Sequence, residues 1–389
     1  MMRQHDFDTP VERRNTNCVK WDCEEAQGAI PMWVADMDFR VAQPIIDALM
    51  RRVEHGVFGY TQVPQAYYDA VVRWFETRHR WHIDSEWMIY TTGVVPALSA
   101  VIKALTLPGD KVLIHTPVYN CFFSSVRNNG CQVEENPLIY EDGTYHIDFN
   151  DLECKAADSK TRLLVLCNPH NPAGRVWTSE ELQRINDICQ RNGVKVVSDE
   201  IHCELVMPGY RFTPFASVSQ ECLDNSITLN SPSKSFNIAG LQTANIICND
   251  SRVRERIDRA ININEICDIN PFGVEALMAA YNESGWWIDQ LCAYLKDNYE
   301  ALKTYMADHL PEVRVTTLEG TYLVWLDIRS LGITSDEATE QLLKEGKVLV
   351  NSGTMYGERA GEGFIRVNIA CPRQQLMLAL ESMCKVLGK

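Results

Sequence analysis

A lysine among hydroxyl-bearing neighbours is the residue of this chain best suited to covalent chemistry. In the stretch SPSKSFNIAG, Lys234 comes after Ser231 and Ser233, and Gly240 would let the backbone approach closely. Most lysines are solvated surface residues, but this one follows the strand-like run SITLN (226–230), at the edge of a sheet where ligands bind. With its pKa lowered by its surroundings, such a lysine can form a Schiff base with a carbonyl cofactor, while the serines hold an anion.

An aspartate and a histidine three residues apart stand in the stretch SDEIH. Asp199 ends the apolar run VKVVSDE, where an aspartate commonly makes a turn. Its carboxylate could instead keep a pyridinium nitrogen protonated, as pyridoxal 5′-phosphate (PLP) requires to act as an electron sink. His202 could reach the phenolic oxygen of that ring, although a single histidine is more often a core residue. The neighbouring Cys203 and Glu204 are also ligand types, but adjacent residues do not easily converge on one ion, so we expect no metal.

A helix start and an aromatic residue could complete a cofactor site. Gly93 opens the helical pattern TGVVPALSAVIKAL, with Pro96 in the first turn, and free N–H groups at a helix start bind phosphate. Many helices begin in this way, so the signal is weak by itself. Tyr119 follows a strand-like run and could stack on a flat cofactor or simply pack in the core.

An asparagine and an arginine are the remaining candidates. In NPHNPAGRVW, two Asn-Pro pairs and a glycine predict a tight turn after a strand, from which Asn171 could bond a cofactor oxygen. Arg366 lies inside the β-rich stretch GFIRVNIACP, and a buried arginine must be paired. Its partner could be an internal carboxylate or the carboxylate of a substrate, which a guanidinium grips with two bonds.

The elements that must position these residues alternate between strands and helices. Strand-like runs occur at 111–117, 163–169, 194–200, 226–230 and 244–248. Between them, 178–193 has helical spacing and a Thr178…Glu181 capping box. Short, continuous apolar strands predict a mostly parallel sheet covered on both faces, with ligands beyond the carboxyl ends of its strands. Residues 286–389 read instead as a smaller α+β domain, with a long helix at 286–310 and paired strands at 313–328.

Composition narrows the possible partners. The chain has 389 residues and a formal net charge of −15. A protein with this much negative charge repels phosphate backbones and anionic lipids. We therefore expect no nucleic acid and no membrane as partners. The start MMRQHDFDTPVERR lacks the apolar core of a signal peptide, and 14 scattered cysteines with no CxxC pair indicate reduced thiols in a cytoplasmic protein. No dinucleotide or P-loop fingerprint occurs.

In their order along the chain, these motifs resemble the fold-type I PLP enzymes of the class I/II aminotransferase superfamily. The segments MWVADMDF, FGYT, TGVVPAL, NPHNPAGRVW, SDEIH and SKSFNIAGLQ are similar to the carbon–sulfur β-lyase branch, the MalY/PatB-type cystathionine β-lyases. The resemblance implies an α/β fold whose large domain has a seven-stranded, mostly parallel sheet between helices. It places the large domain at 50–284 and a smaller α+β domain at 1–49 and 285–389.

The resemblance also implies a role for each candidate residue. Lys234 would be the Schiff-base lysine and the proton-transfer base. The other cofactor-binding positions would be Asp199, Asn171, His202, Tyr119, Gly93, Val94, Val95, Ser231, Ser233 and Tyr60. Tyr60 would reach the phosphate of a neighbouring subunit, which implies a homodimer. The substrate-binding positions would be Arg366 on the α-carboxylate, with Tyr119, Trp33 and Asp36; Asp38 lies in the same N-terminal segment.

Two departures from typical aminotransferases indicate the reaction. His202 stands where they have a tyrosine, and Gln242 stands where they have a phosphate-binding arginine eight residues after the lysine. Both departures match the lyase branch, so we expect β-elimination, in which a substrate such as L-cystathionine yields a thiol, pyruvate and ammonia. The alternative is an aminotransferase, which needs a keto acid acceptor. A PLP-binding regulatory protein is a further alternative, although no basic tail, coiled coil or low-complexity arm indicates one.

Overall fold

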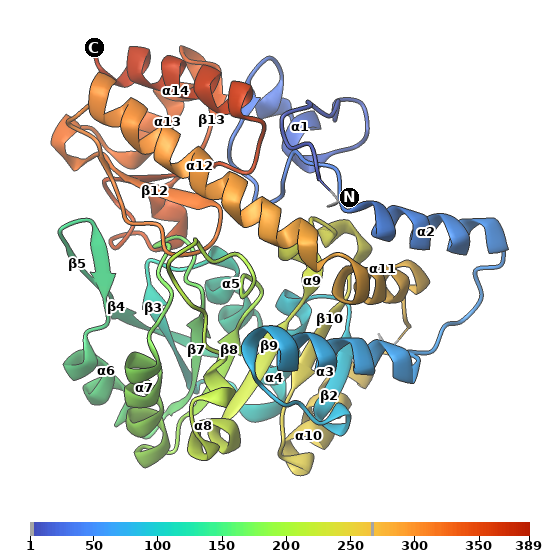
Figure 1. Ribbon diagram of the computed structural model, residues 1–389. Helices are drawn as coiled ribbons and strands as arrows, with labels where there is room; N and C mark the ends of the chain where they lie inside the picture. The colour runs from blue at the N-terminus through green and yellow to red at the C-terminus, as the bar shows by residue number, and fades with distance from the viewer. Residues whose placement is uncertain (1–3, 266–267) are drawn as a thin grey trace.

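The computed structural model describes residues 4–265 and 268–389. Its centre is a seven-stranded sheet with helices on both faces, and a second, smaller sheet lies beyond one end of it (Figure 1). The large sheet has the order β2-β10-β9-β8-β7-β3-β4. Only β10 runs antiparallel to its neighbours, so the expectation of a seven-stranded, mostly parallel sheet is confirmed. The strands are β2 (Met88–Thr91), β3 (Lys111–Thr116), β4 (Gln132–Pro137), β7 (Thr161–Cys167), β8 (Lys195–Asp199), β9 (Ser226–Asn230) and β10 (Ala244–Ile247).

The strands of this sheet are apolar because both of their faces are buried. Along β3, Val112 and Ile114 pack on one face while Leu113 packs on the other. The first face is covered by α4 (Val94–Leu105), α5 (Asn120–Asn128) and α10 (Ser251–Asn262), and the second by α6 (Phe149–Ala156), α7 (Ser179–Arg191) and α8 (Gln220–Asn225). The predicted capping box of α7 is present, with Glu181 N–H donating to Thr178 Oγ1 at 3.2 Å.

The C-terminal part of the chain forms a four-stranded antiparallel sheet of order β11-β12-β15-β14. Its strands are β11 (Arg314–Val315), β12 (Leu323–Asp327), β14 (Asn351–Ser352) and β15 (Phe364–Asn368), and its helices are α12 (Gly285–His309), α13 (Ser335–Lys344) and α14 (Arg373–Leu387). The expected long helix and paired strands are therefore confirmed. Helices α2 (Gln43–His55), α3 (Gln65–His79) and α11 (Pro271–Glu283) pack together beside the large sheet.

The N-terminal segment lies against the C-terminal part, as the dark blue and red ribbons of Figure 1 show. Strand β1 (Ile30–Pro31) pairs in parallel with β13 (Val348–Leu349), and Asp38 N–H donates to Ala370 O at 2.9 Å. We retain the division at 50–284 as a proposal; its first boundary falls inside α2 and its second between α11 and α12.

Short elements connect these units. They are α1 (Val19–Asp22), α9 (Pro232–Ser235), β5 (Ile139–Glu141), β6 (Thr144–His146) and the 3₁₀ turns Glu24–Ala26, Ser85–Trp87, Phe215–Ser217, Ala239–Leu241, Arg329–Leu331 and Gly353–Tyr356. All cysteines in the described part of the chain are free thiols, and most are buried. Among the described residues, no helix has the length and apolar character needed to cross a bilayer.

A buried histidine on β3 makes stability fall in acid. Burial lowers the pKa of His115 to about 4, and only part of this shift is offset by its 2.7 Å contact with Asn136. The unfolded chain takes up a proton near pH 6.5 and the folded chain does not, so the stabilisation is complete above pH 6.5 and is lost as pH falls toward 4. At pH 5 we expect a loss of roughly 2 kcal/mol from this group. Urea unfolding of the wild type and of His115→Gln at pH 7 and pH 5 measures it; equal pH dependence in both proteins would refute the assignment.

Candidate active site

A cavity of about 390 Å³ lies at the carboxyl ends of the parallel strands, where α/β sheets bind ligands. Its walls come from the ends of β7, β8 and β9, the start of α4, the N-terminal segment and the small sheet. A larger cavity of about 630 Å³ lies behind α4, but Lys103 is the one charged residue of its described lining. Groups able to do chemistry converge in the smaller cavity, which is therefore the candidate site.

Lys234 enters this cavity from the short helix α9, directly after β9. Its Nζ donates to the carbonyl oxygen of Ala35 at 2.6 Å. Burial lowers the pKa of Lys234, and the nearby carboxylates of Asp36 and Asp199 offset part of that effect. A lysine whose neutral form is favoured in this way is a better nucleophile and base than a surface lysine, as the sequence predicts for this position.

Asp199 lies at the carboxyl end of β8 and is buried. Burial raises its pKa to about 7, although the Ile201 N–H bonds Oδ1 at 3.1 Å and Lys234 contributes a favourable charge. A close cationic partner would lower the pKa of a buried carboxylate, so the raised pKa of Asp199 indicates that no ion pair compensates its burial. A pyridinium nitrogen would supply that partner, so this residue fits the cofactor ring that the sequence predicts.

Arg366 reaches the cavity from β15 of the small sheet, and the structure brings it to Asn171. Its Nη1 donates to Asn171 Oδ1 at 3.2 Å and its Nη2 to Trp33 O at 2.6 Å, while its buried Nε has no partner. The guanidinium lies over the Tyr356 ring, 4.8 Å from the centroid. Within the described residues no carboxylate forms an ion pair with Arg366. Of its two expected partners, an internal carboxylate is therefore not observed, and the guanidinium remains able to grip an anionic ligand.

The start of α4 forms another wall. Gly93 is the N-cap of α4, and Gly93, Val94 and Val95 all line the cavity, where first-turn N–H groups can meet a phosphate. Ser233 lines it as well. Ser231 has a different task, because its hydroxyl donates to Thr243 O at 2.6 Å and accepts from Ser233 N–H at 3.0 Å. Its contribution is to cap α9.

Tyr119 and His202 both line the cavity. Tyr119 is the N-cap residue of α5, and His202 follows β8 with its Nδ1 buried and without a partner. Burial lowers the pKa of His202 to about 3, so the imidazole is neutral and can hydrogen-bond a ligand oxygen. The unpartnered nitrogens of His202 and Arg366 are the groups that a bound polar ligand would satisfy.

Three residues of the expected set do not line the cavity, and others were missed. Asp36 pairs with Arg13 at 2.6 Å and with Lys20 at 3.5 Å, whereas Trp33 of the same segment does line the cavity. Tyr60 is 98% exposed, and the Ser231 hydroxyl bonds Thr243 O and Ser233 N–H.

Several lining residues were not expected from the sequence. They include Cys167, Ala35, Met355, Tyr356 and Asn351. Of these, Asn351 had a signal, because it is a polar residue at the end of the run VLVN.

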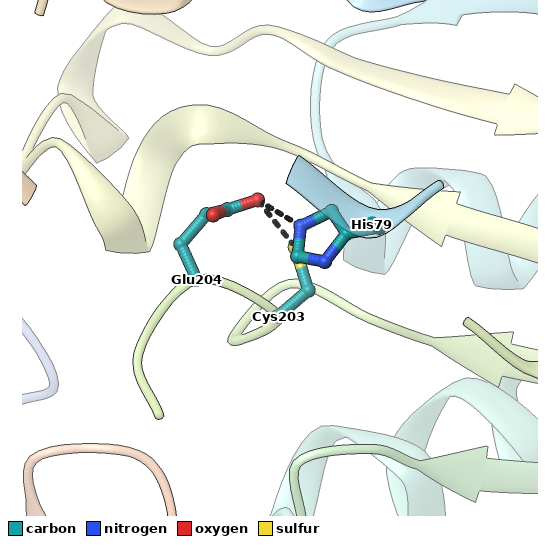
Figure 2. Close-up of side chains that lie close together, drawn as sticks. All are labelled: His79, Cys203 and Glu204. Atoms are coloured by element: carbon teal, nitrogen blue, oxygen red, sulfur yellow. Dashed lines mark hydrogen bonds and ion pairs between the residues drawn. The ribbon is translucent and has the colours of Figure 1, made fainter. Parts of the chain in front are cut away.

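Figure 2 shows a cluster of residues outside the cavity lining, in which the Glu204 carboxylate points toward His79 and Cys203. Their ligand atoms lie within 4.8 Å of one another, which is compatible with a metal. However, Glu204 already accepts bonds from His79 Nε2 at 2.6 Å, Trp74 Nε1 at 2.7 Å and Arg78 Nε at 3.1 Å. Burial raises the pKa of Glu204, but these neighbours outweigh it and hold that pKa below its usual value. The Arg78 cation supplies the charge that a metal would bring, so the cluster is a structural ion pair between α3 and the loop after β8.

Glu204→Gln should therefore destabilise the protein by about 1–3 kcal/mol, because a neutral amide accepts the bonds of Arg78 and His79 more weakly than the buried carboxylate does. Denaturant unfolding of the loaded protein measures the change. The matched control is Asp289→Asn, which removes an exposed partner of the same Arg78, 2.7 Å away, and should cost less than about 1 kcal/mol. A loss of stability on metal chelation, with little effect of Glu204→Gln, would point to a metal instead.

Comparison with known proteins agrees with this geometry. The profile of the family "Aminotransferase class I and II" matches residues 35–383. The chain is 44% identical to cystathionine beta-lyase PatB of Bacillus subtilis (94% of this chain, 95% of that protein) and 35% identical to protein MalY of Escherichia coli (95% and 96%). The crystal structure of the PLP-bound C-S lyase from Staphylococcus hominis superposes with a TM-score of 0.94 at 32% identity (100% and 99%).

Proposed function

The chain belongs to the aminotransferase class I and II family, and from this premise we propose that it is a PLP-dependent carbon–sulfur β-lyase. Its fold is the fold-type I PLP-dependent transferase fold. The observation that carries the proposal is the convergence of Lys234, Asp199 and Arg366 in one cavity of a chain whose relatives are named cystathionine beta-lyases and C-S lyases.

The residues of the cavity fit PLP. When bound, this cofactor supplies an electron sink for negative charge at the substrate Cα. Lys234 would attach it covalently, Asp199 would hold its ring nitrogen, and Asn171 with His202 would contact its phenolic oxygen. Tyr119 would stack on the ring. The amides of Val94 and Val95, opened by Gly93, would hold the phosphate together with Ser233, with Ser231 acting through the α9 cap.

Other residues of the cavity would bind the substrate and remove its Cα proton. Arg366 would grip the α-carboxylate with two N–H bonds, which fixes the position of Cα. The Lys234 amine would take the Cα proton, a role that needs its neutral form and is favoured by the lowered pKa described above. The Cβ–S bond would break with its electron pair on sulfur, the leaving group would take up a proton to become a thiol, and addition of water to the remaining fragment would give pyruvate and ammonia. Trp33 lies at the wall, and Asp36 stabilises the segment behind it through Arg13 and Lys20.

An aminotransferase would use the same residues but return the proton to the cofactor. Two differences from typical aminotransferases favour the lyase: His202 replaces a tyrosine and Gln242 replaces an arginine. In the structure, a neutral His202 lines the cavity, and Gln242 lies outside the described lining. The names of the relatives support the same choice. Substrates would be L-cystathionine or related cysteine S-conjugates, since each presents the same α-amino acid end.

We also propose a cytoplasmic homodimer. Tyr60 is 98% exposed and stands in a mostly exposed stretch between α2 and α3, outside the described lining of the cavity. Such an exposed aromatic residue is suited to contact the phosphate of a neighbouring site. Sedimentation of the wild type and of Tyr60→Phe, combined with their PLP affinity, tests this assignment.

The function is tested by pyruvate release from L-cystathionine with the PLP-loaded protein and no keto acid. We expect steady turnover with equal yields of pyruvate and homocysteine. Conversion of the cofactor to its amine form, with no pyruvate until a keto acid is added, would assign the chain to the aminotransferases.

A further inference from the structure

A tyrosine outside the cavity lining shares one hydrogen-bond acceptor with Lys234. The hydroxyl of Tyr322 donates to the carbonyl oxygen of Ala35 at 3.0 Å, and Lys234 Nζ donates to the same oxygen at 2.6 Å. Tyr322 is completely buried, directly before β12, and its ring lies 6.0 Å from the His202 ring in an edge-on arrangement. The lysine and the tyrosine thus meet at one backbone atom of the N-terminal segment.

The Ala35 carbonyl is held in place by the turn around it. Asp36 N–H donates to Val34 O at 2.9 Å, which closes a γ-turn centred on Ala35. The side-chain amide of Asn368 donates to both flanking carbonyls, those of Val34 at 2.5 Å and Asp36 at 2.7 Å. With both neighbours pinned by one side chain, the Ala35 oxygen is fixed at a defined position facing Lys234 and Tyr322.

The Ala35 oxygen has one lone pair for each donor, but both bonds draw on the same partial negative charge, so each bond weakens the other. The ammonium form of Lys234 donates more strongly than the neutral amine, so an acceptor available to the lysine alone favours the ammonium form. The hydrogen bond from the Tyr322 hydroxyl makes the Ala35 oxygen a weaker acceptor for Lys234. Burial raises the pKa of Tyr322, so its hydroxyl stays protonated and remains a donor throughout the working pH range.

We propose that Tyr322 is a positioning residue for Lys234: through the shared Ala35 carbonyl it fixes where the free amine lies and weakens the hold of that carbonyl on the ammonium form. This inference rests on the proposed role of Lys234 as the PLP-binding base. The other groups acting on the lysine are the carboxylates of Asp36 and Asp199, the Arg366 guanidinium and the Cys121 thiol, with neutral His202 facing it from the loop after β8. None of these groups donates to Ala35 O among the described residues.

The test is Tyr322→Phe, with PLP uptake by the stripped full-length protein followed by absorbance as a function of pH. Only the neutral amine attacks the PLP aldehyde, so the uptake rate reports the titration of Lys234. We expect the midpoint to rise by about half to one pH unit and uptake below it to slow by about 3- to 10-fold, with an unchanged plateau at high pH. The acid limb of kcat in the loaded enzyme should shift in the same direction.

The control is Tyr299→Phe, which removes a buried hydroxyl bonded to Thr316 O at 2.8 Å, away from the cavity. It should leave the midpoint unchanged. Slower uptake at every pH in Tyr322→Phe, without movement of the midpoint, would show a merely structural role and overturn the proposal, as would an unaltered profile. Failure of the proposed function is distinguishable, because it would remove pyruvate release from the wild type while leaving the PLP uptake profile measurable.

Discussion

Lys234→Ala should reduce pyruvate release by at least about 10⁴-fold, the largest effect expected of any single substitution in this chain. The variant loses the covalent attachment of PLP and the base for the Cα proton at once. General-base catalysis by one side chain contributes typically about 10²–10⁴-fold, and the loss of the covalent step adds to it. The measurements are the steady-state rate of pyruvate formation and the absorbance of the cofactor–lysine imine, which should disappear.

The matched control is Lys195→Ala on β8 of the same sheet. Its amine donates to Asp224 O at 2.8 Å and does not line the cavity. It should keep both the imine absorbance and the turnover of the wild type. Retained turnover in Lys234→Ala would contradict the assignment, whereas loss in both variants would indicate a general effect on folding.

Arg366→Lys should lower kcat/KM by about 10²- to 10³-fold, which corresponds to roughly 3–4 kcal/mol of lost binding. Lysine keeps the charge but lacks the planar fork that binds a carboxylate with two bonds, and it cannot also reach Asn171 and Trp33 as Arg366 does. Most of the loss should appear in KM, because the carboxylate is held equally before and during the reaction. Steady-state kinetics with L-cystathionine separate the two parameters.

A substrate analogue isolates the interaction. A decarboxylated cysteine S-conjugate should be a poor substrate for the wild type, and Arg366→Lys should discriminate far less between it and the carboxylated parent. Because Asn171 loses its Arg366 partner in this variant, both substrates are assayed at saturating PLP. As a control for Arg-to-Lys substitution, Arg162→Lys on β7 changes an exposed arginine 3.6 Å from Asp110 and should leave KM unchanged. Undiminished discrimination in Arg366→Lys would show that the carboxylate is bound elsewhere.

Much of the cofactor side of the site was predictable because it depends on local order. Lys234, Asp199 and Asn171 each lie at or just beyond the carboxyl end of a strand of one mostly parallel sheet, and the carboxyl ends of parallel strands share an edge. The alternation of apolar strands with capped helices therefore predicted that these side chains would meet. The start of α4 was predictable for the same reason, since Gly93 and Pro96 mark a helix terminus in the sequence itself.

The tertiary structure decided the tasks of residues whose partners are distant. Ser231 is suited by type to hold phosphate, yet its hydroxyl is committed to Thr243 O and the α9 cap. Asp36 was expected at the substrate entrance; its carboxylate acts on Lys234 through its charge and pairs with Arg13 and Lys20. A side chain of suitable chemistry can satisfy an internal partner as readily as a ligand, and only the packing shows which one lies within reach.

The sequence by itself determined the fold class, the ligand-binding edge of the sheet and the residue types placed there, because strand and helix periodicity and turn chemistry are local properties. Only the tertiary structure decided that Arg366 meets Asn171 across 195 residues of chain, and that Lys234 and Tyr322 meet at the carbonyl of Ala35. These contacts join the small sheet, the large sheet and the N-terminal segment. Their existence depends on how separate elements pack on one another, which no periodicity within a single element encodes.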